Sequence, residues 1–364
     1  MKRLVIKIGS NLIASAEHGL NTARLRRITK DISDVIDKGY EVVIVSSGAI
    51  AAGLKKLGLK EKPKDIKLKQ AAAAIGQSSL MWAYEHSLKD FGKKAAQVLL
   101  TRDDVSDRVR YINAKNTILT LLSYGVIPII NENDSTAVDE IKFGDNDFLA
   151  SMVSGLIEAG MFIILSDVDG LYRKDPKEGE AELISCVEEI TTEIEKMAKG
   201  KGSVIGTGGM YSKLLAAKQA VNHGIPVVIM SGRKAGLLPR LIDGEKVGTY
   251  LKPKEQKLPS RKGWIAYGLR SKGMIYLDEG AVKALTVHGK SLLPSGITKV
   301  EGAFNIGDAV TCLTEDGKKI AKGLTNYSSQ ELMRIKGKKT SEIEGLLGYK
   351  YSDEVIHRDN LVLT

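Results

Sequence analysis

The sequence has few cysteines and few aromatic residues, and each shortage excludes a class of protein. Two cysteines occur among 364 residues, Cys186 and Cys312, far apart and without a CxxC pair or a nearby histidine. Neither a disulfide framework nor a zinc site is supported, which indicates a reducing compartment. Aromatic residues make up 5% of the chain, which is poor material for a surface that stacks nucleic-acid bases.

Long apolar runs are also missing. No stretch approaches the roughly 18 uninterrupted apolar residues of a spanning helix, so we expect a soluble, cytoplasmic protein with no membrane contact. Residues 1–7 resemble the start of a secretory signal, but Lys7 interrupts the apolar run and no small-residue cleavage site follows. We interpret this segment as the first strand of the fold.

The overall composition is that of a globular protein with an excess of positive charge. Hydrophobic residues make up 43% and charged residues 27% of the chain, whose length suffices for about two domains. The formal net charge of +10 indicates either a nucleic-acid partner or an anionic small substrate. The excess is shared by both parts of the chain, with residues 256–364 the more basic per residue.

Up to about residue 250, short β-branched runs alternate with longer amphipathic segments. This pattern predicts an α/β fold with an open, mostly parallel sheet sandwiched by helices. The predicted strands are 4–8, 41–45, 95–100, 126–130, 162–165 and 226–230. A helix capped by Asn21 or Thr22 follows the first strand, and further helices are predicted at 67–88, 111–124, 147–159 and 210–223.

The pattern changes after Tyr250. Residues 253–263 are polar and contain two prolines, so they are predicted to be a linker between a domain at 1–252 and a smaller one at 264–364. Short strands with glycine turns are predicted at 274–277, 291–292, 309–314 and 320–323. The second domain is therefore expected to be small and rich in β-structure.

Two turns near the N-terminus are candidate anion sites, because ligands of an open parallel sheet bind outside the carboxyl ends of its strands. Lys7 lies near the end of the first strand and precedes a turn at Gly9. Ser46-Ser47-Gly48 leads from the second strand into a helix N-terminus, where a carboxylate or phosphate can bind. A structural glycine turn and a simple helix cap are the alternative interpretations.

Two later regions offer acidic and glycine-rich turns. Asn131-Glu132-Asn133-Asp134 follows a hydrophobic strand, and Gly144-Asp145-Asn146-Asp147 opens a helix after a predicted hairpin at 135–143. These carboxylates and amides suit an ammonium group, a metal or the orientation of a lysine, although a solvated acidic loop is the alternative.

The last turns are Ser166-Asp167 and the run at 206–213, which enters a helix and ends in Lys213. Leu214 follows that lysine, so the run is not a Walker A loop, yet it suits phosphate binding; a flexible loop with a surface lysine is the alternative. If the sheet is parallel, Lys7 and Lys213 converge on one anion, as phosphoryl transfer requires.

The order and spacing of these motifs resemble the amino acid kinase family, and within it the members that phosphorylate glutamate and carry a C-terminal PUA domain. The resemblance spans essentially the whole chain. It rests on residues 7–11, 45–53, 130–134, 144–147 and 206–213, and for the PUA domain on 278–281, 291–294, 302–304 and 307–308.

The resemblance implies an ATP-dependent kinase that converts the γ-carboxylate of L-glutamate to L-glutamyl 5-phosphate, the first step of proline biosynthesis, with feedback inhibition by proline. It also implies Mg²⁺ bridging the ATP phosphates largely through water, with no protein metal ligand assigned. A homo-oligomer, dimer or tetramer, and coupling to glutamate-5-semialdehyde dehydrogenase are further expectations from the resemblance.

The resemblance also implies roles for individual residues. Lys7 and Lys213 would flank the γ-phosphoryl group, and Asp147 would hold both lysines. Residues implied in glutamate binding are Ser47, Gly48, Asp134, Asp145 and Asn146. Residues implied in ATP binding, besides the two lysines, are Gly9, Ser166, Asp167, Thr207, Gly208, Gly209, Met210, Tyr211 and Ser212.

Two alternatives compete with this interpretation. A related kinase of N-acetylglutamate or aspartate would use the same phosphate chemistry, although the acidic loop argues against a substrate without a free ammonium group. A PUA-containing protein that binds or modifies RNA would explain the basic C-terminal part but leaves the two phosphate-site lysines without a role.

Overall fold

The computed structural model divides the chain into two compact units, Met1–Lys257 and Leu258–Thr364. It describes residues 2–59, 61, 63, 65–136, 146–174, 179, 181–199, 209–254 and 260–363. No helix in these ranges is both long and apolar enough to cross a membrane.

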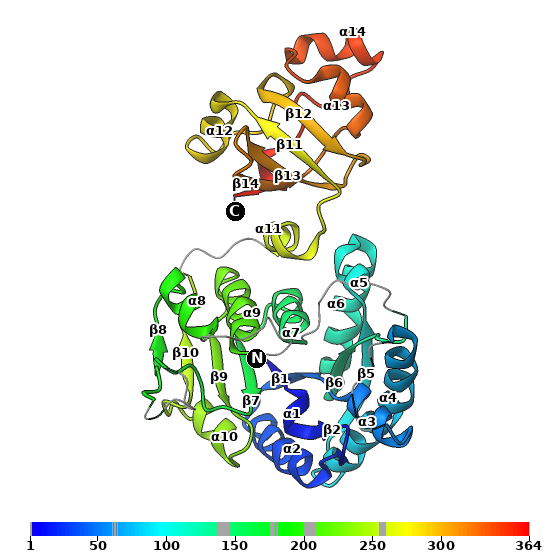
Figure 1. The fold of residues 1–364 in the computed structure, drawn as a ribbon, viewed down its shortest axis with the longest axis vertical. Helices are drawn as coiled ribbons and strands as arrows, with labels where there is room; N and C mark the ends of the chain where they lie inside the picture. Colours follow the sequence, from blue (N-terminus) through cyan, green and yellow to red (C-terminus); the bar gives the residue numbers. More distant parts are fainter. Residues whose placement is uncertain are drawn as a thin grey trace. The chain divides into compact units, whose positions relative to one another are not determined.

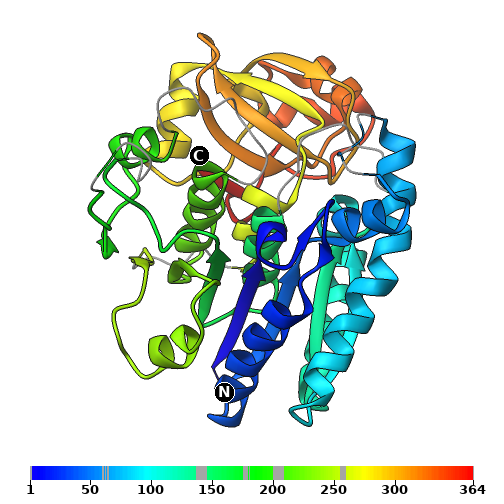
Figure 2. The same cartoon turned by 60° about the horizontal axis from the view of Figure 1, so that its bottom comes forward.

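Unit 1 is built on an open sheet (Figures 1 and 2). Its described part has eight strands in the order β5-β6-β4-β1-β7-β9-β10-β8, of which the first six are parallel and β10 runs antiparallel to β9. The predicted α/β fold is confirmed, and all six predicted strands are present. The strands are β1 Arg3–Ile8, β4 Glu41–Ser46, β5 Lys94–Leu100, β6 Val126–Glu132, β7 Met161–Ser166, β8 Cys186–Val187, β9 Val227–Ser231 and β10 Thr249–Leu251.

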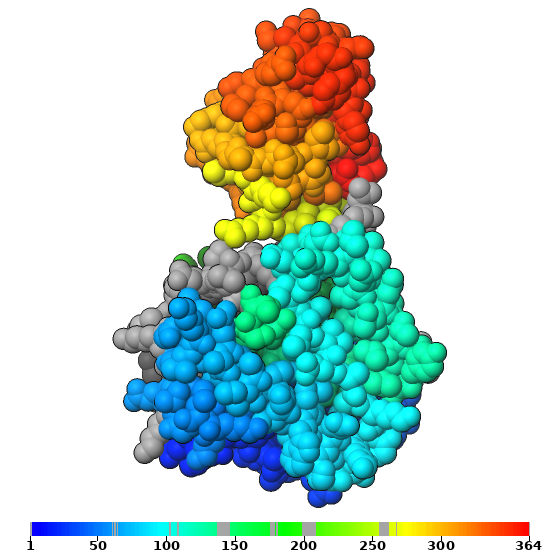
Figure 3. All heavy atoms as spheres, turned by 90° about the vertical axis from the view of Figure 1, so that its right-hand side faces the viewer, coloured from blue at the N-terminus to red at the C-terminus, as the bar shows by residue number. Residues whose placement is uncertain are grey.

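Helices cover both faces of this sheet. Figure 3 shows the side at the edge strand β5, where α4 to α6 form the outer surface in light blue to cyan. The predicted helices correspond to α2, α4, α6, α7 and α9, although α7 ends earlier than expected. The helices are α1 Ser10–Ile13, α2 Thr22–Asp37, α3 Ala49–Lys56, α4 Ile66–Lys89, α5 Arg102–Ser106, α6 Arg108–Ser123, α7 Asn146–Leu156, α8 Thr192–Lys199, α9 Met210–Asn222 and α10 Leu237–Ile242.

The alternation of side chains along β1 decides which face receives Lys7. Leu4, Ile6 and Ile8 pack in the core that β1 forms with α2 and α4. Val5 points to the opposite face and packs with α7 and α9. Lys7 is two residues after Val5 and points to the same face of the sheet. Its side chain therefore lies on the face covered by α7 and α9, at the carboxyl end of the strand.

Helices α3 and α4 cross with their backbones in direct contact. A Cβ added at Gly53 would lie 1.8 Å from the Ala72 carbonyl oxygen, and one added at Gly76 would lie 1.8 Å from the Ala49 carbonyl oxygen. Such distances leave no room for any side chain at either glycine. The crossing fixes the N-terminal end of α3, which directly follows β4, against the middle of α4.

Unit 2 contains a five-stranded sheet in the order β12-β11-β13-β14-β15 and a small hydrophobic core of its own. Three predicted strands are present as β11, β13 and β14. The prediction at 291–292 was wrong, since Leu292 forms only an isolated bridge to Ile356. The elements are α11 Ser260–Gly263, β11 Gly273–Leu277, α12 Glu279–Thr286, β12 Ile297–Gly302, β13 Ala309–Thr314, β14 Lys319–Leu324, α13 Ser329–Ile335, α14 Ile343–Leu347 and β15 Leu361–Leu363.

Two strands of unit 2, β12 and β15, were not predicted from the sequence. Strand β12 alternates weakly and β15 has three residues, so neither carries a clear period-two signal. The last four residues of the predicted linker form α11, which continues directly into a single π-helical turn, Trp264–Gly268.

Candidate functional site

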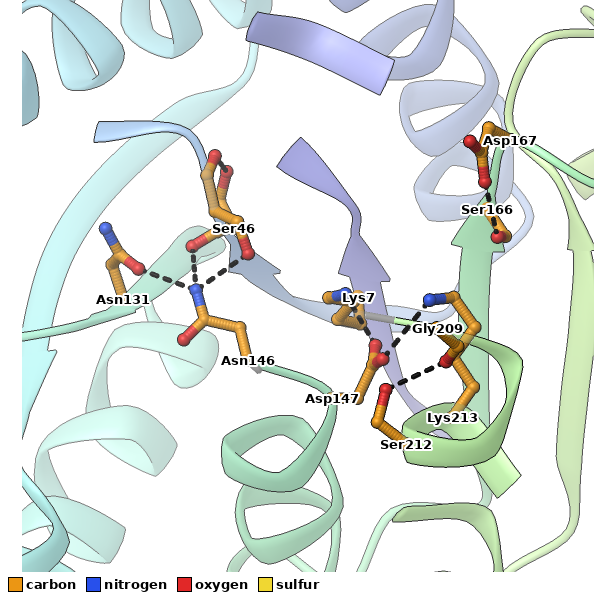
Figure 4. Close-up of polar contacts among 11 residues, drawn as sticks. Lys7, Ser46, Asn131, Asn146, Asp147, Ser166, Asp167, Gly209, Ser212 and Lys213 are labelled. Carbon is orange, nitrogen blue, oxygen red and sulfur yellow. Dashed lines mark hydrogen bonds and ion pairs between the residues drawn. The ribbon is translucent and has the colours of Figure 1, made fainter. Parts of the chain in front are cut away.

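The candidate site lies at the carboxyl ends of the central parallel strands, where helices α3, α7 and α9 begin (Figure 4). Strand β1 contributes Lys7, β4 leads into Ser47, and β7 ends at Ser166. Parallel pairing aligns these ends, with Ile8 opposite Ser46 and Lys7 opposite Ile164. Turns that are far apart in the sequence therefore meet at one edge of the sheet.

Two lysines share one buried carboxylate at this edge. The Nζ of Lys7 lies 2.5 Å from Oδ1 of Asp147, and the Nζ of Lys213 lies 3.5 Å from Oδ2 of the same residue. Lys7, Lys213 and Asp147 are 2%, 6% and 0% exposed. Taken by themselves, the three side chains carry one net positive charge in a water-poor environment, where an anion is bound strongly.

Local structure places each member of this group. Asp147 is the second residue of α7, and Lys213 lies one turn into α9. Gly209 precedes α9 in an extended conformation, and the Ser212 hydroxyl donates to its carbonyl at 2.8 Å. The amides of the first turn of α9 and the positive end of its dipole thus lie beside the two lysines, which also favours an anion.

Asn146 ties three segments of the site together. Its Nδ2 donates to the Ser46 carbonyl at 2.7 Å, to Ser47 Oγ at 2.9 Å and to Asn131 Oδ1 at 2.8 Å. These bonds connect α7 to the ends of β4 and β6. The turn after Ser47 requires glycine, because Gly48 has φ 111° and a Cβ there would lie 3.2 Å from the Ala14 Cβ.

Gly9 brings backbone close to the ammonium group of Lys7. Its amide donates to the Leu165 carbonyl at 3.3 Å, which ties the turn after β1 to β7. A Cβ at Gly9 would lie 4.0 Å from Lys7 Nζ. That distance is an ordinary van der Waals contact, so glycine only spares this place a side chain next to the lysine.

Carboxylates line a cavity that adjoins the Asn146 hydrogen bonds, since Gln77 on its wall accepts from Asn131. A cavity of about 280 Å³ lies between α3, α4, β5 and the turn after β6, and its wall includes Glu132 and Asp134. Burial, and secondarily the charge of Asp134, raises the pKa of Glu132 to about 7. The same features favour a cationic ligand group here, because an ammonium group would restore the charged form of Glu132.

The nucleotide-side candidates lie at the ends of β7 and β9. Ser166 is buried, and its hydroxyl donates to Oδ1 of Asp167 at 3.2 Å. A guanidinium nitrogen of Arg233 lies 3.9 Å from Oδ2 of Asp167. Met210 and Tyr211 form the first turn of α9. The structure thus brings Ser166 and Asp167 to the same sheet edge as Lys7 and Lys213.

Three predicted site residues lie outside the described residues, namely Asp145, Thr207 and Gly208. Residues 137–143 of the predicted hairpin lie outside them as well.

The structure also adds residues that sequence reasoning did not assign to the site. Asn131 was noticed only as part of an acidic turn, yet it is 2% exposed and accepts from Asn146. Gln77 and Tyr84 lie in the alanine-rich helix α4, where Gln77 accepts from Asn131 and the Tyr84 hydroxyl is 2.8 Å from Ser46 Oγ. Burial raises the pKa of Tyr84. The sequence around α4 carried no signal for either residue.

An open, mostly parallel sheet whose strand ends hold two buried lysines on one carboxylate is an arrangement that suits phosphoryl chemistry. The chain belongs to the amino acid kinase family: the model of that family matches residues 2–231. Residues 273–347 match the model of the PUA domain.

Curated relatives cover the full length of the chain. Glutamate 5-kinase of Syntrophotalea carbinolica is 51% identical over 100% of this chain and 97% of its own length. The enzymes of the same name from Geobacter sulfurreducens and Caldanaerobacter subterraneus are 51% and 50% identical, over 100% and 99% of this chain and 98% and 97% of their own lengths. Among solved structures, UMP kinase from Bacillus anthracis is 18% identical with a TM-score of 0.48, over 69% of this chain and 96% of that one.

Proposed function

We propose that this protein is a glutamate 5-kinase, which transfers the γ-phosphoryl group of ATP to the γ-carboxylate of L-glutamate and forms L-glutamyl 5-phosphate. The observation that carries the proposal is the group formed by Lys7, Asp147 and Lys213, in which two cations meet at one carboxylate. Full-length relatives that share half of the sequence and bear this name support the choice of acceptor.

The transfer needs positioning and charge more than proton chemistry. An oxygen of the glutamate γ-carboxylate attacks the γ-phosphorus, while the bond from that phosphorus to the bridging oxygen of ADP breaks. The carboxylate is already ionised near neutral pH, so no general base is required. Lys7 and Lys213 would contact the migrating group and stabilise the charge on its equatorial and leaving oxygens, and Asp147 would hold both ammonium groups in place.

Glutamate would bind on the side of the site formed by β4, β6 and α7. Asn146 donates to the Ser46 carbonyl and to Ser47 Oγ, and Ser47, the adjacent Gly48 and Asn146 would contact the reacting carboxylate. Asp134, on the wall of the neighbouring cavity, would pair with the α-ammonium group, and Asp145 would complete the acidic side. This division places the negative end of the substrate near the lysines and its ammonium group near carboxylates.

ATP would bind on the opposite side, along Gly9, Ser166, Asp167 and the segment 207–213. Mg²⁺ bound together with ATP would neutralise part of the phosphate charge. The metal prefers oxygen ligands, and the described ranges contain no group of three or more histidine, cysteine, aspartate or glutamate side chains that could hold it. Mg²⁺ would be held by phosphate oxygens and water, with no protein ligand assigned to it.

The proposed product determines further expectations. An acyl phosphate reacts readily with water, so a reducing enzyme that consumes it promptly is expected, which for glutamyl phosphate is glutamate-5-semialdehyde dehydrogenase. We place the reaction at the first step of proline biosynthesis and expect inhibition by proline. A homo-oligomer is part of the same proposal.

ADP release in the presence of ATP, Mg²⁺ and a panel of acceptors tests the proposal. L-Glutamate, aspartate and N-acetylglutamate are compared at equal concentration, and hydroxylamine is added to trap an acyl phosphate as its hydroxamate. We expect release and hydroxamate with glutamate and less release when proline is added. Preference for aspartate or N-acetylglutamate would overturn the choice of acceptor. Salt-dependent RNA binding without any acceptor-dependent ADP release would favour the RNA-binding alternative.

A further inference from the structure

Four side-chain amides form a continuous chain from the candidate site to the cavity wall. Asn146 Nδ2 donates to Asn131 Oδ1 at 2.8 Å, and Asn131 Nδ2 donates to Gln77 Oε1 at 2.9 Å. Gln77 Nε2 then donates to Gln97 Oε1 at 3.2 Å. The first of these bonds is drawn in Figure 4. The chain links α7, β6, α4 and β5, and its last two members line the cavity.

Backbone groups fix the direction of this chain. The Ser46 carbonyl can only accept, so Asn146 must turn its Nδ2 toward it. The Glu132 amide can only donate, and it donates to Asn131 Oδ1 at 2.9 Å. The Asn131 Oδ1 therefore faces Asn146 and the Glu132 amide. The Asn131 Nδ2 must then point toward α4, where it donates to an acceptor.

The acceptor is supplied by Gln77, one residue after the glycine at which α4 touches α3. A side chain without an acceptor at this position would leave Asn131 Nδ2, on a residue that is 2% exposed, without its partner. A buried donor without a partner is costly, so the Asn131 amide would be driven to turn or shift. Either movement removes one of the three acceptors that hold the Asn146 amide.

We propose that Gln77 is a positioning residue of the kinase, which acts through Asn131 to hold the Asn146 amide toward Ser47 and the acceptor substrate. The inference rests on the proposed function, since it assigns Asn146 to the glutamate side of the site. Gln77 itself does not touch the reacting atoms. We expect its main effect on the acceptor side, because the bonds of Asn146 go to Ser46, Ser47 and Asn131 and not to Lys213 or Ser166.

The substitution Gln77→Met tests the proposal, because it keeps the length of the side chain and removes the acceptor. We expect the KM for glutamate to rise roughly tenfold, on the scale of one lost buried hydrogen bond, while the KM for ATP stays within about twofold. A merely structural role would instead lower the fraction of active enzyme and leave both KM values unchanged. An unchanged KM for glutamate in a folded variant overturns the proposal.

Gln97→Met is the matched control. Gln97 lines the same cavity but is exposed, and its removal leaves the bond from Asn131 to Gln77 in place. We expect a change in the KM for glutamate of less than about twofold, since water can replace an exposed partner. Equal effects of the two substitutions would show that the bond from Asn131 to Gln77 has no special role and would overturn the proposal.

Gln77→Glu provides a rescue. Its carboxyl group accepts from Asn131 in either protonation state, and when protonated it also donates to Gln97. We expect a KM for glutamate closer to wild type than that of Gln77→Met, and a value no better than that of the Met variant contradicts the proposal. Absence of glutamate-dependent ADP release in the wild-type protein would refute the proposed function instead, so the two failures are distinguishable.

Discussion

The ammonium nitrogen of Lys7 lies 2.5 Å from Oδ1 of Asp147, and both side chains are almost completely buried. The two residues are 140 positions apart in the chain and meet because β1 and α7 pack against each other. A buried ion pair is retained where its geometry serves a function or where its partners are fully satisfied. Here the second oxygen of the carboxylate faces Lys213, so the pair belongs to a larger charged group.

Lys7→Ala is expected to lower turnover by roughly 10²- to 10³-fold, the scale for removing one group that stabilises transition-state charge. The measurement is kcat for glutamate-dependent ADP release, with circular dichroism to verify folding. Lys218→Ala is the control, because Lys218 lies on α9 with Lys213 but is exposed and paired with Glu195 at 2.6 Å. A folded Lys7→Ala protein with wild-type kcat would remove Lys7 from the mechanism.

Asp147→Asn is expected to destabilise the protein, because it leaves two buried ammonium groups without their shared carboxylate. The expected loss is about 3 kcal/mol in the free energy of unfolding. ATP with Mg²⁺ should recover part of it, since phosphate oxygens can take over the charge pairing. Urea unfolding with and without nucleotide measures both effects.

The matched control for this change is Asp34→Asn. Asp34 also pairs with a lysine at 2.5 Å, but the pair is exposed on α2. Its loss should cost less than about 1 kcal/mol. Similar losses in the free energy of unfolding for Asp147→Asn and Asp34→Asn would mean that the two buried lysines do not depend on the Asp147 carboxylate.

Gly76→Ala is expected to destabilise unit 1 by about 3 kcal/mol or more, because the new Cβ would overlap the Ala49 carbonyl and force α3 and α4 apart. Gly345→Ala in α14 is the matched substitution at a glycine with open space around it. It should stabilise its helix by about 0.5–1 kcal/mol. Thermal unfolding should show a lower melting temperature for Gly76→Ala and a higher one for Gly345→Ala. An unchanged melting temperature for Gly76→Ala would contradict the close helix crossing.

Glu132 is expected to make stability depend on pH. Burial and the charge of Asp134 raise its pKa from 4.5 to about 7, so the folded protein binds this proton more tightly than the unfolded chain does. The stability that the protonated Glu132 gives the folded protein is therefore fully present below about pH 4.5. This stability is lost as the pH rises through about 7. Glu132→Gln should be more stable than wild type above pH 7, by roughly 2 kcal/mol, with the difference vanishing at low pH. Parallel pH profiles of the two proteins would show that Glu132 has an ordinary pKa.

A chain that ends at Lys257 is expected to keep phosphoryl transfer. Every residue assigned to the site lies within unit 1, which has its own two-sided core. The kcat of the truncated chain should stay within about threefold of the full chain, as is typical of domains that fold independently. Complete loss of activity in a truncated chain that still unfolds cooperatively would show that unit 2 shapes the site.

Sequence alone determined the mostly parallel sheet, six of its strands and the place of Lys7 near the end of the first one. These features follow from local rules: β-branched runs, alternation along a strand, and turn residues such as Gly48 between a strand and a helix. The convergence of Lys7 and Lys213 followed from the same rules, once strand ends were placed at one edge of the sheet.

Only the tertiary structure decided the rest, because it depends on which elements pack together. The bond from Asn146 to the Ser46 carbonyl spans 100 positions, and the bond from Asn131 to Gln77 spans 54. No local pattern marks a glutamine in an alanine-rich helix as the partner of an asparagine at a strand end. Likewise, the raised pKa of Glu132 comes from its burial among packed elements and from the charge of Asp134, and the tight crossing at Gly76 comes from the docking of α3 on α4.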